Sequence, residues 1–285
     1  MNKSVITKTN NKFFNLLNQN TMKTKILTAA ALLLFTTASL AQTEGDSKPK
    51  FEKRRNHIDI EAGTGSGKME DNQLSNSEIN YTSQSLRLGY EHHLKNDFRF
   101  QLYFTNEATK LKQESEGLDA PYVAFEARLG FLAPVVKTKG GFNIHLGSSY
   151  AFSTRFAECE NRNQNDGNFS SLTAHHLNAA VQFEYQKNRW RSSLGLNMPI
   201  VARVYRSNDP NISIEDGEFS PLFENGKRAT PKNYKVPEAT LMVGYKVTNF
   251  LELNLNYNYK QINSSLGADI RQVEQQLRLG AMLNF

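Results

Sequence analysis

The sequence predicts an all-β protein, a transmembrane antiparallel up-and-down β-barrel of about ten strands. Three observations predict it. Apolar residues recur at every second position over most of the chain after residue 57, which is the spacing of side chains on one face of a strand. Short polar turns alternate with longer polar links, as in barrels that cross a membrane. Aromatic residues gather near both ends of the expected strands, and aliphatic residues lie between them.

The start of the chain is expected to lie outside the barrel. Residues 22–41 open with two lysines, continue with an apolar run too short to span a bilayer, and end with the small residues Ser39 and Ala41 before the cleavage position. This is the pattern of a secretory signal peptide. Residues 1–21 are polar and precede the signal, so we expect them to be a non-native extension and translation to begin at Met22. The alternative is that they form an unusually long n-region of the signal peptide.

The residues between the signal peptide and the first strand are charged. Residues 42–56 lack periodicity and are expected to form a flexible periplasmic lead-in to a barrel at 57–285. The net charge of +6 does not indicate nucleic acid as a partner, because five bases and no acids lie in residues 1–41. The single cysteine, Cys159, excludes an internal disulfide.

Ten stretches alternate between apolar and polar residues and are the expected strands. They are centred on residues 58–62, 86–90, 98–104, 123–131, 142–152, 177–185, 190–200, 239–247, 251–259 and 277–285. The long links are expected near 66–80, 107–120, 157–170, 207–233 and 263–271. Eight or twelve strands stay open as alternatives, because a long link can contain a further hairpin. An even strand count returns both ends of the barrel to the periplasm.

The polar phase of the strands is expected to face the lumen. It carries charges of both signs, and buried charges need partners of opposite sign. We therefore expect a lumen charge network that fills the barrel, which favours a plug over a conducting pore. The network is predicted at Arg87, Glu91, Glu126, Arg128, Glu184, Glu252, Glu274 and Arg278. Glu61, Arg99 and Lys246 belong to the same inward charged phase.

The chain ends in QQLRLGAMLNF, an alternating strand that closes on the aromatic residue Phe285. This ending resembles the C-terminal strand of outer-membrane β-barrel proteins of Gram-negative bacteria. The resemblance implies export to the cell outer membrane and contact with outer-membrane lipid and lipopolysaccharide. It also implies that the barrel-assembly machinery reads the last strand, with Phe285 as the assembly signal. It implies no activity.

Two motifs that could bind a ligand are better explained as ordinary parts of strands. Residues 62–68 read AGTGSGK, close to a phosphate-binding loop, but Met69 replaces the hydroxyl residue of that motif and no helix pattern follows. We read them as the end of a strand that enters a loop. His92 and His93 are adjacent on a strand, so their side chains point to opposite faces and cannot chelate a metal together. No cofactor or metal is expected.

The sequence favours a non-enzymatic scaffold whose external loops bind a ligand or partner. The link near 207–233 is the expected contact surface because of its length and mixed composition. One alternative is a narrow channel for small solutes. The other is a barrel enzyme that acts on lipid or peptide. Its candidate residues are Asp209, Glu215, Asp216 and Glu218 in that link, with His175 or His176.

Overall fold

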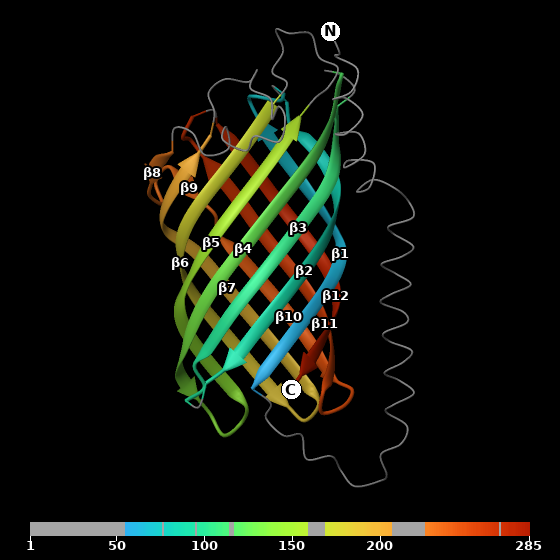
Figure 1. Ribbon diagram of the computed structural model, residues 1–285, viewed down its shortest axis with the longest axis vertical. Coiled ribbons are helices and arrows are strands. Elements are labelled where there is room, and N and C mark those ends of the chain that lie inside the picture. The colour runs from blue at the N-terminus through green and yellow to red at the C-terminus, as the bar shows by residue number, and fades with distance from the viewer. Residues whose placement is uncertain are drawn as a thin grey trace, which may run out of the picture. The chain divides into compact units, whose positions relative to one another are not determined.

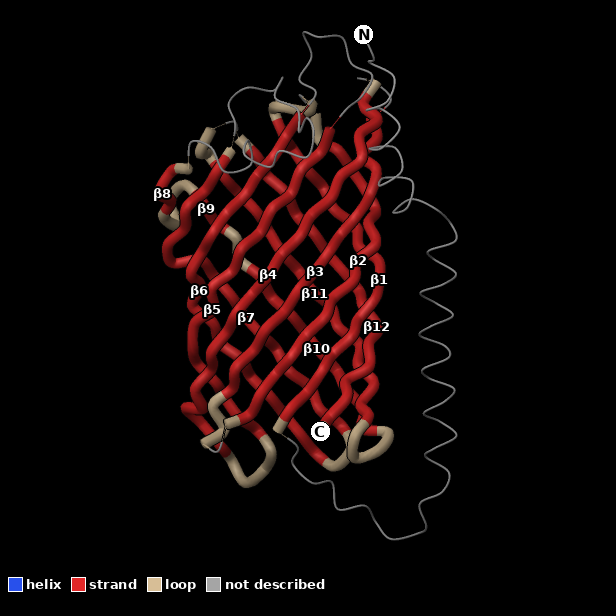
Figure 2. The backbone as a smooth tube through the Cα atoms, viewed as in Figure 1, coloured by secondary structure: helices blue, strands red, loops and turns tan. Residues whose placement is uncertain are grey.

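The computed structural model of this chain describes a single barrel. The described residues are 55–75, 77–94, 96–113, 117–158, 169–206, 226–267 and 269–285. The expected extension at 1–21, signal peptide at 22–41 and nearly all of the lead-in at 42–56 lie outside them, as does Cys159. The described residues form strands and turns (Figure 2). In this part of the chain, no helix is long and apolar enough to cross a membrane.

Ten long strands and two short ones make up the sheet (Figure 1). In chain order they are β1 (Asn56–Asp71), β2 (Ile79–His93), β3 (Arg99–Gln113), β4 (Leu118–Lys137), β5 (Phe142–Glu158), β6 (Phe169–Lys187), β7 (Trp190–Tyr205), β8 (Lys227–Ala229), β9 (Tyr234–Lys235), β10 (Glu238–Lys246), β11 (Leu251–Ser264) and β12 (Ile270–Asn284).

The ten long strands close on themselves. Each pairs antiparallel with the next along the chain, β7 pairs with β10, and β12 pairs with β1. The short strands β8 and β9 extend the wall beyond β10, where β8 pairs with β7 and β9 pairs with β11. The prediction of an up-and-down barrel of about ten strands is therefore confirmed. Closure leaves none of the ten long strands without two neighbours.

One end of the barrel, which we call the turn end, carries the short connections, the first residue of β1 and the last residue of the chain. There, Asn56 and Phe285 exchange backbone hydrogen bonds of 3.0 and 2.9 Å. The tight turns use residues that tolerate a positive φ, namely Asp97, Asn188 and Gly141. At Gly141 a Cβ atom would stand 2.0 Å from the carbonyl oxygen of Gln186, so only glycine fits. The opposite end, the loop end, carries the longer links.

Two of the long links are much shorter than the sequence predicts. The link expected near 66–80 is confined to residues 72–78, because β1 continues to Asp71 and β2 begins at Ile79. The link expected near 107–120 is confined to 114–117, because β3 continues to Gln113 and β4 begins at Leu118. Glycine and polar residues outnumber apolar ones at these strand ends. They resemble loop sequence for that reason.

The apolar face of the strands changes side along the barrel axis. On β2, Leu86 and Leu88 point outward and are exposed, whereas Ile79 and Tyr81, nearer the loop end, point inward and are buried. The outward positions between residues 78 and 84 are polar. On β12, Leu279 is 69% exposed on the outer face, whereas Ile270 is buried inside. A strand thus has an apolar outer face near the turn end and an apolar inner face near the loop end.

The inward apolar residues at the loop end pack into one cluster, which we call the loop-end core. It draws on nine of the long strands, which are all of them except β10, on both short strands, and on the links after β1 and β9. Its members are Met69, Leu74, Ile79, Tyr81, Leu111, Leu118, Ala120, Tyr122, Ala124, Ala157, Leu172, Ala174, Ala202, Val204, Ala229, Tyr234, Val236, Ile262 and Ile270. The loop end therefore has the packed apolar interior of a water-soluble barrel.

A buried ion pair fixes the margin of the loop-end core. Arg206, directly after β7, donates to Asp71 at the end of β1 over 2.6 Å, and both side chains are 1% exposed. Ser170 also donates to Asp71, and Arg206 donates to the carbonyl oxygen of Ser171 over 2.9 Å. The pair ties the end of β1 to β6 and β7, which are not its neighbours in the sheet.

We predict that Arg206→Ala destabilises the barrel strongly. It leaves Asp71 buried without its cation, which costs about 3 to 5 kcal/mol. The temperature at which the folded barrel is lost should fall by about 10 °C, measured by the disappearance of the compact band in unheated gel samples.

The matched control is Arg271→Ala, because Arg271 pairs with Glu70 at 3.7 Å and both side chains are exposed. An exposed pair contributes less than about 1 kcal/mol. Equal losses for the two variants would contradict the structural role of the buried pair.

Candidate functional site

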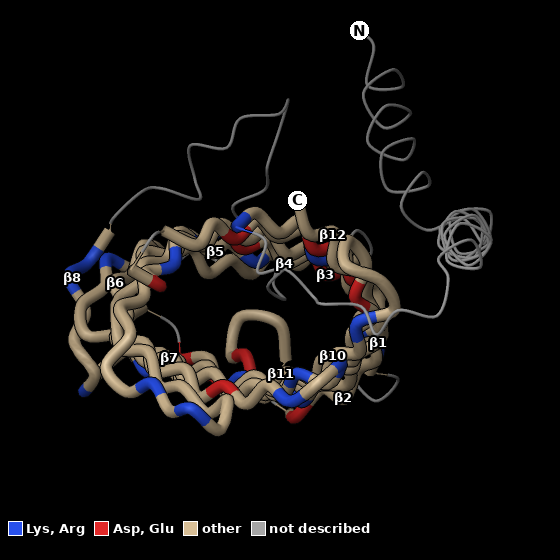
Figure 3. The backbone as a smooth tube through the Cα atoms, turned by 90° about the horizontal axis from the view of Figure 1, so that it is seen from below, with Lys and Arg blue, Asp and Glu red and all other residues tan. Residues whose placement is uncertain are grey.

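The lumen between the turn end and the loop-end core is the candidate functional site. It contains a cavity of about 170 Å³. Acids and bases line the cavity in nearly equal number, together with asparagine, serine and glycine. Viewed along the barrel axis, charged residues are spread around the wall (Figure 3). The site is thus a polar interior with little net charge, enclosed by strands on every side.

Glu61 on β1 is the centre of one charge group. Arg87 on β2 lies 3.4 Å from its carboxylate, and Arg278 on β12 lies 3.1 Å from it. The amide of Asn256 donates to the same carboxylate over 2.8 Å. Arg87 also stacks over the ring of Tyr103, 4.0 Å from its centroid. One carboxylate therefore holds two guanidinium groups from the two neighbouring strands.

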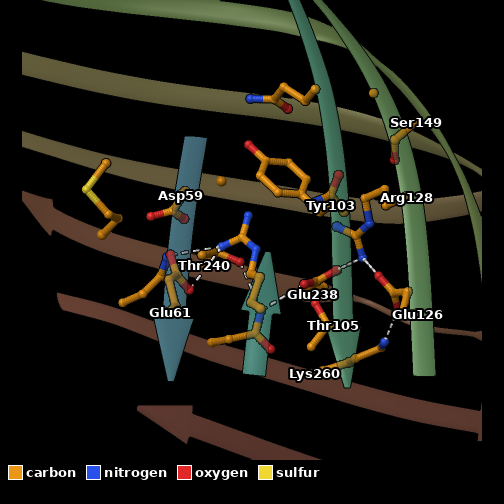
Figure 4. Close-up of a pocket in the computed structure, with 18 of the residues that line it drawn as sticks. Asp59, Glu61, Tyr103, Thr105, Glu126, Arg128, Ser149, Glu238, Thr240 and Lys260 are labelled. Carbon is orange, nitrogen blue, oxygen red and sulfur yellow. Dashed lines mark hydrogen bonds and ion pairs between the residues drawn. The ribbon is translucent and has the colours of Figure 1, made fainter. Parts of the chain in front are cut away.

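A second charge group crosses the lumen. Arg128 on β4 pairs with Glu126 on the same strand and with Glu238 on β10. Lys260 on β11 also pairs with Glu126 (Figure 4). In the closed strand order β4 and β11 are separated by the same number of strands in either direction. These ion pairs therefore join opposite walls of the barrel.

A third group lies beneath the loop-end core and also crosses the lumen. Arg155 on β5 lies 3.0 Å from Glu274 and donates to Gln272 over 2.8 Å, both on β12. The amide of Gln272 in turn donates to the hydroxyl oxygens of Tyr81 and Tyr122 over 2.6 and 2.8 Å. The two strands again face each other across the ring.

The turn end of the lumen holds further buried pairs. Arg99 on β3 lies 2.6 Å from Glu184 on β6 and 3.7 Å from Glu91 on β2. Arg191 on β7 lies 2.8 Å from Glu252 on β11. His93 also contacts Glu91. Charge pairs therefore occupy the lumen from the turn end to the lower edge of the loop-end core.

The residues proposed from the sequence as a lumen charge network all belong to these groups. Only Glu126 and Arg128 pair directly with each other, and the others pair with residues outside that set. The structure places their contacts as follows: Arg87 and Arg278 with Glu61, Glu91 and Glu184 with Arg99, Glu252 with Arg191, and Glu274 with Arg155. Phe285 is exposed at the turn end beside Asn56.

Sequence reasoning missed four members of the charge groups, namely Arg155, Arg191, Glu238 and Lys260. Glu238 and Lys260 extend the polar phase of β10 and β11 by one further step, and that continuation was the available signal. Arg191 likewise lies in the inward phase of β7. Arg155 lies within two residues of the link predicted at 157–170, so it reads as a loop residue and not as an inward strand residue.

The other residues considered from the sequence show no site in the described part of the chain. Residues 62–68 belong to the regular strand β1, so the reading as a strand end entering a loop is wrong. Gly67 leaves room for the ring of Tyr81, which a Cβ atom would meet at 2.2 Å. His176 is buried and contacts Asn178 at 2.8 Å. Asp209, Glu215, Asp216 and Glu218 lie outside the described residues, within which no cluster of His, Cys, Asp and Glu could hold a metal.

We predict that Glu61→Gln destabilises the barrel by about 3 kcal/mol or more, because it leaves Arg87 and Arg278 facing each other without a carboxylate. Glu70→Gln is the control, since Glu70 is exposed and forms only a long pair. The quantity to measure is the urea concentration at half-unfolding in lipid vesicles. A midpoint for Glu61→Gln that matches Glu70→Gln would show that the charge group does not hold the strands together.

No protein-family model matches the sequence, and no curated protein is significantly similar to it. Solved structures with a similar shape are outer-membrane β-barrels. Neisserial surface protein A is 12% identical with a TM-score of 0.37 over 80% of this chain and 97% of that one. The translocator domain of the autotransporter NalP from Neisseria meningitidis is 8% identical with a TM-score of 0.44, over 90% and 98% of the two chains.

A third similar structure is a FadL homologue from Pseudomonas aeruginosa, which is 10% identical with a TM-score of 0.34 over 81% of this chain and 90% of that chain. The assignment of the fold rests on the strand pairing of the chain itself. The chain is a closed, ten-stranded, antiparallel up-and-down β-barrel.

Proposed function

We propose that the chain is an integral outer-membrane barrel that acts as a non-enzymatic scaffold with a filled lumen. The observation that carries this proposal is the change of apolar face along the strands. Near the turn end the large apolar side chains point away from the barrel, where water would be a poor solvent for them. Near the loop end they point inward and the outer face is polar. A lipid bilayer around the turn-end part alone accounts for both faces.

The size of the apolar outer band supports a membrane. A tilted strand needs about nine to eleven residues to cross the hydrocarbon core, and the outward apolar runs at 123–131 on β4 and 177–185 on β6 have this length. Aromatic pairs lie at the turn-end margin, with Trp190 against Tyr245 and Phe98 against Phe131 at centroid distances of 4.9 and 5.6 Å. Aromatic side chains favour this position at the headgroup interface.

The filled lumen supports a scaffold rather than a channel. Ion pairs join opposite walls at two levels, and the loop-end core lies between the lumen cavity and the loop end. An open water path would separate these charges or would have to cross packed apolar side chains. The part that stands beyond the proposed bilayer is a water-facing barrel rim, suited to hold external loops in fixed positions. In this proposal the loops contact a ligand or partner.

We predict that two outward positions on β12 differ in their access to water in intact cells. In a Cys159→Ser background, Leu279→Cys should resist a charged maleimide because acyl chains cover it. Arg271→Cys lies on the same face of the same strand and should react readily. Labelling is measured by mass shift after extraction. Rapid labelling of both positions would contradict the membrane proposal.

We also predict that the purified full chain does not conduct in planar bilayers, because cross-lumen pairs and the loop-end core block the path. Single-channel recordings in symmetric potassium chloride provide the measurement, with a known porin in the same bilayers as the positive control. Regular conductance steps of porin size would favour the narrow-channel alternative and would contradict the filled lumen.

A further inference from the structure

The outer face of the barrel carries a row of four cross-strand neighbours on β5 to β8. Phe152 pairs with His175, His175 pairs with Arg203, and Arg203 pairs with Arg228. Arg203 and Arg228 are both exposed. The wall around β8 is coloured for Lys and Arg when the barrel is viewed along its axis (Figure 3). We call Arg203, Arg228 and His175 the arginine row.

The two arginines lie directly opposite each other, which is unfavourable without an anion. Opposite residues on antiparallel strands have their Cβ atoms about 4.5 to 5.5 Å apart, and like charges there repel. Among the described residues no acid forms an ion pair with Arg203 or Arg228. Arg203 instead lies over the ring of Tyr205, 5.5 Å from its centroid.

Three other exposed bases near the loop end have acidic partners. Lys68 pairs with Glu78 at 2.9 Å, Lys110 pairs with Asp119 at 2.7 Å, and Arg271 pairs with Glu70 at 3.7 Å. The exposed lysines Lys112, Lys227, Lys232 and Lys235 form no ion pair with a described acid either, but none of them lies directly opposite another base in the strand pairing. Within the described strands, the arginine row thus differs from the rest of the loop end because it places two bases directly opposite each other without an acid that pairs with either.

The position of the arginine row indicates what its anion is. The outward neighbours toward the turn end are the exposed apolar residues Leu177, Met198 and Ile200. Toward the loop end the outer face becomes polar. The arginine row therefore lies at the loop-end margin of the apolar outer band, at the depth of lipid headgroups. The aromatic rings of Tyr150, Phe152 and Tyr205 surround His175 with centroid distances of 6.1, 5.0 and 5.8 Å.

We propose that the arginine row binds the phosphate-bearing glycolipid headgroup of the outer leaflet. The inference rests on the proposed membrane placement of the barrel. Paired guanidinium groups match a phosphate, because each can donate two parallel hydrogen bonds to its oxygens. The phosphate relieves the repulsion between the arginines, while the acyl chains of the same molecule cover the apolar side chains below. The flat aromatic side chains contact the sugar part.

The test compares two lipids and three proteins. The full chain, Arg203→Gln/Arg228→Gln and Arg271→Gln are inserted into phosphatidylcholine nanodiscs. Each is titrated with lipid A that carries two phosphates, or with the same lipid after both phosphates are removed. Lipid retained on the released protein is counted by native mass spectrometry. Arg271→Gln is the matched control, since it removes one exposed outward arginine that already has an acidic partner.

We expect the full chain and Arg271→Gln to bind the phosphorylated lipid about tenfold more tightly than the dephosphorylated lipid, since charge-assisted bidentate contacts supply that difference. The double variant should bind both lipids equally. Equal preference in all three proteins, or no preference in any, would overturn the inference.

Unfolding in urea is a second measurement. It shows whether the double variant folds, and the expected change in stability has opposite sign in the two lipids. In pure phosphatidylcholine it should unfold at a higher urea concentration than the full chain, because two repelling charges are gone. In vesicles that contain the phosphorylated lipid it should unfold at a lower concentration. A variant that is less stable in both lipids would contradict the proposed repulsion and its relief.

The two proposals fail in different ways. Insertion into phosphatidylcholine requires no phosphorylated glycolipid, so a chain that does not insert refutes the membrane placement and with it the arginine row. A chain that inserts but ignores the phosphates refutes only the arginine row.

Discussion

The structure depends on one constraint, which is that each strand must place its apolar side chains away from water at both ends of the barrel. Near the turn end this is achieved on the outer face, and near the loop end on the inner face. The period-two alternation of a strand allows either choice, since a strand only has to exchange which phase is apolar. On β2 the exchange falls between Tyr81 and Leu86. A single continuous sheet thus has an apolar outer face near the turn end and a polar outer face near the loop end.

The charged lumen follows from the same constraint. Where the outer face is apolar, the inner face receives the polar phase, and an enclosed polar interior is stable only if its charges are neutralised. Glu61 and Glu126 each form ion pairs with two basic side chains. The ion pair of Lys260 with Glu126 and that of Arg155 with Glu274 each join opposite walls of the barrel. Such pairs need opposite strands to lie at matching heights. A slip of one residue would turn every inward charge outward, so strand register and lumen charge are coupled.

Much of the fold could be predicted from the sequence, because alternation and turn residues are local signals. Leu86, Leu88 and Tyr90 indicate a strand without any knowledge of the neighbours. The extension of β1 to Asp71 and of β3 to Gln113 could not be predicted in this way. These strand ends are stabilised by contacts with the loop-end core, and their sequences contain few apolar residues. The partners of the lumen charges could not be predicted from the sequence either. Strands β5 and β12 are not neighbours in the sheet, so no local signal indicates that Arg155 pairs with Glu274. Which charges meet depends on closure, tilt and height.

The most direct test of the exchange of apolar face is a scan of spin labels along the outward residues of β2, in a cysteine-free chain reconstituted in bilayers. The accessibility of each label to oxygen, which concentrates in acyl chains, is compared with its accessibility to a water-soluble nickel chelate. The account predicts that oxygen dominates at Leu86, Leu88 and Tyr90 and that the nickel chelate dominates at Asn80 and Thr82. Equal nickel accessibility at Leu88 and Asn80 would contradict it.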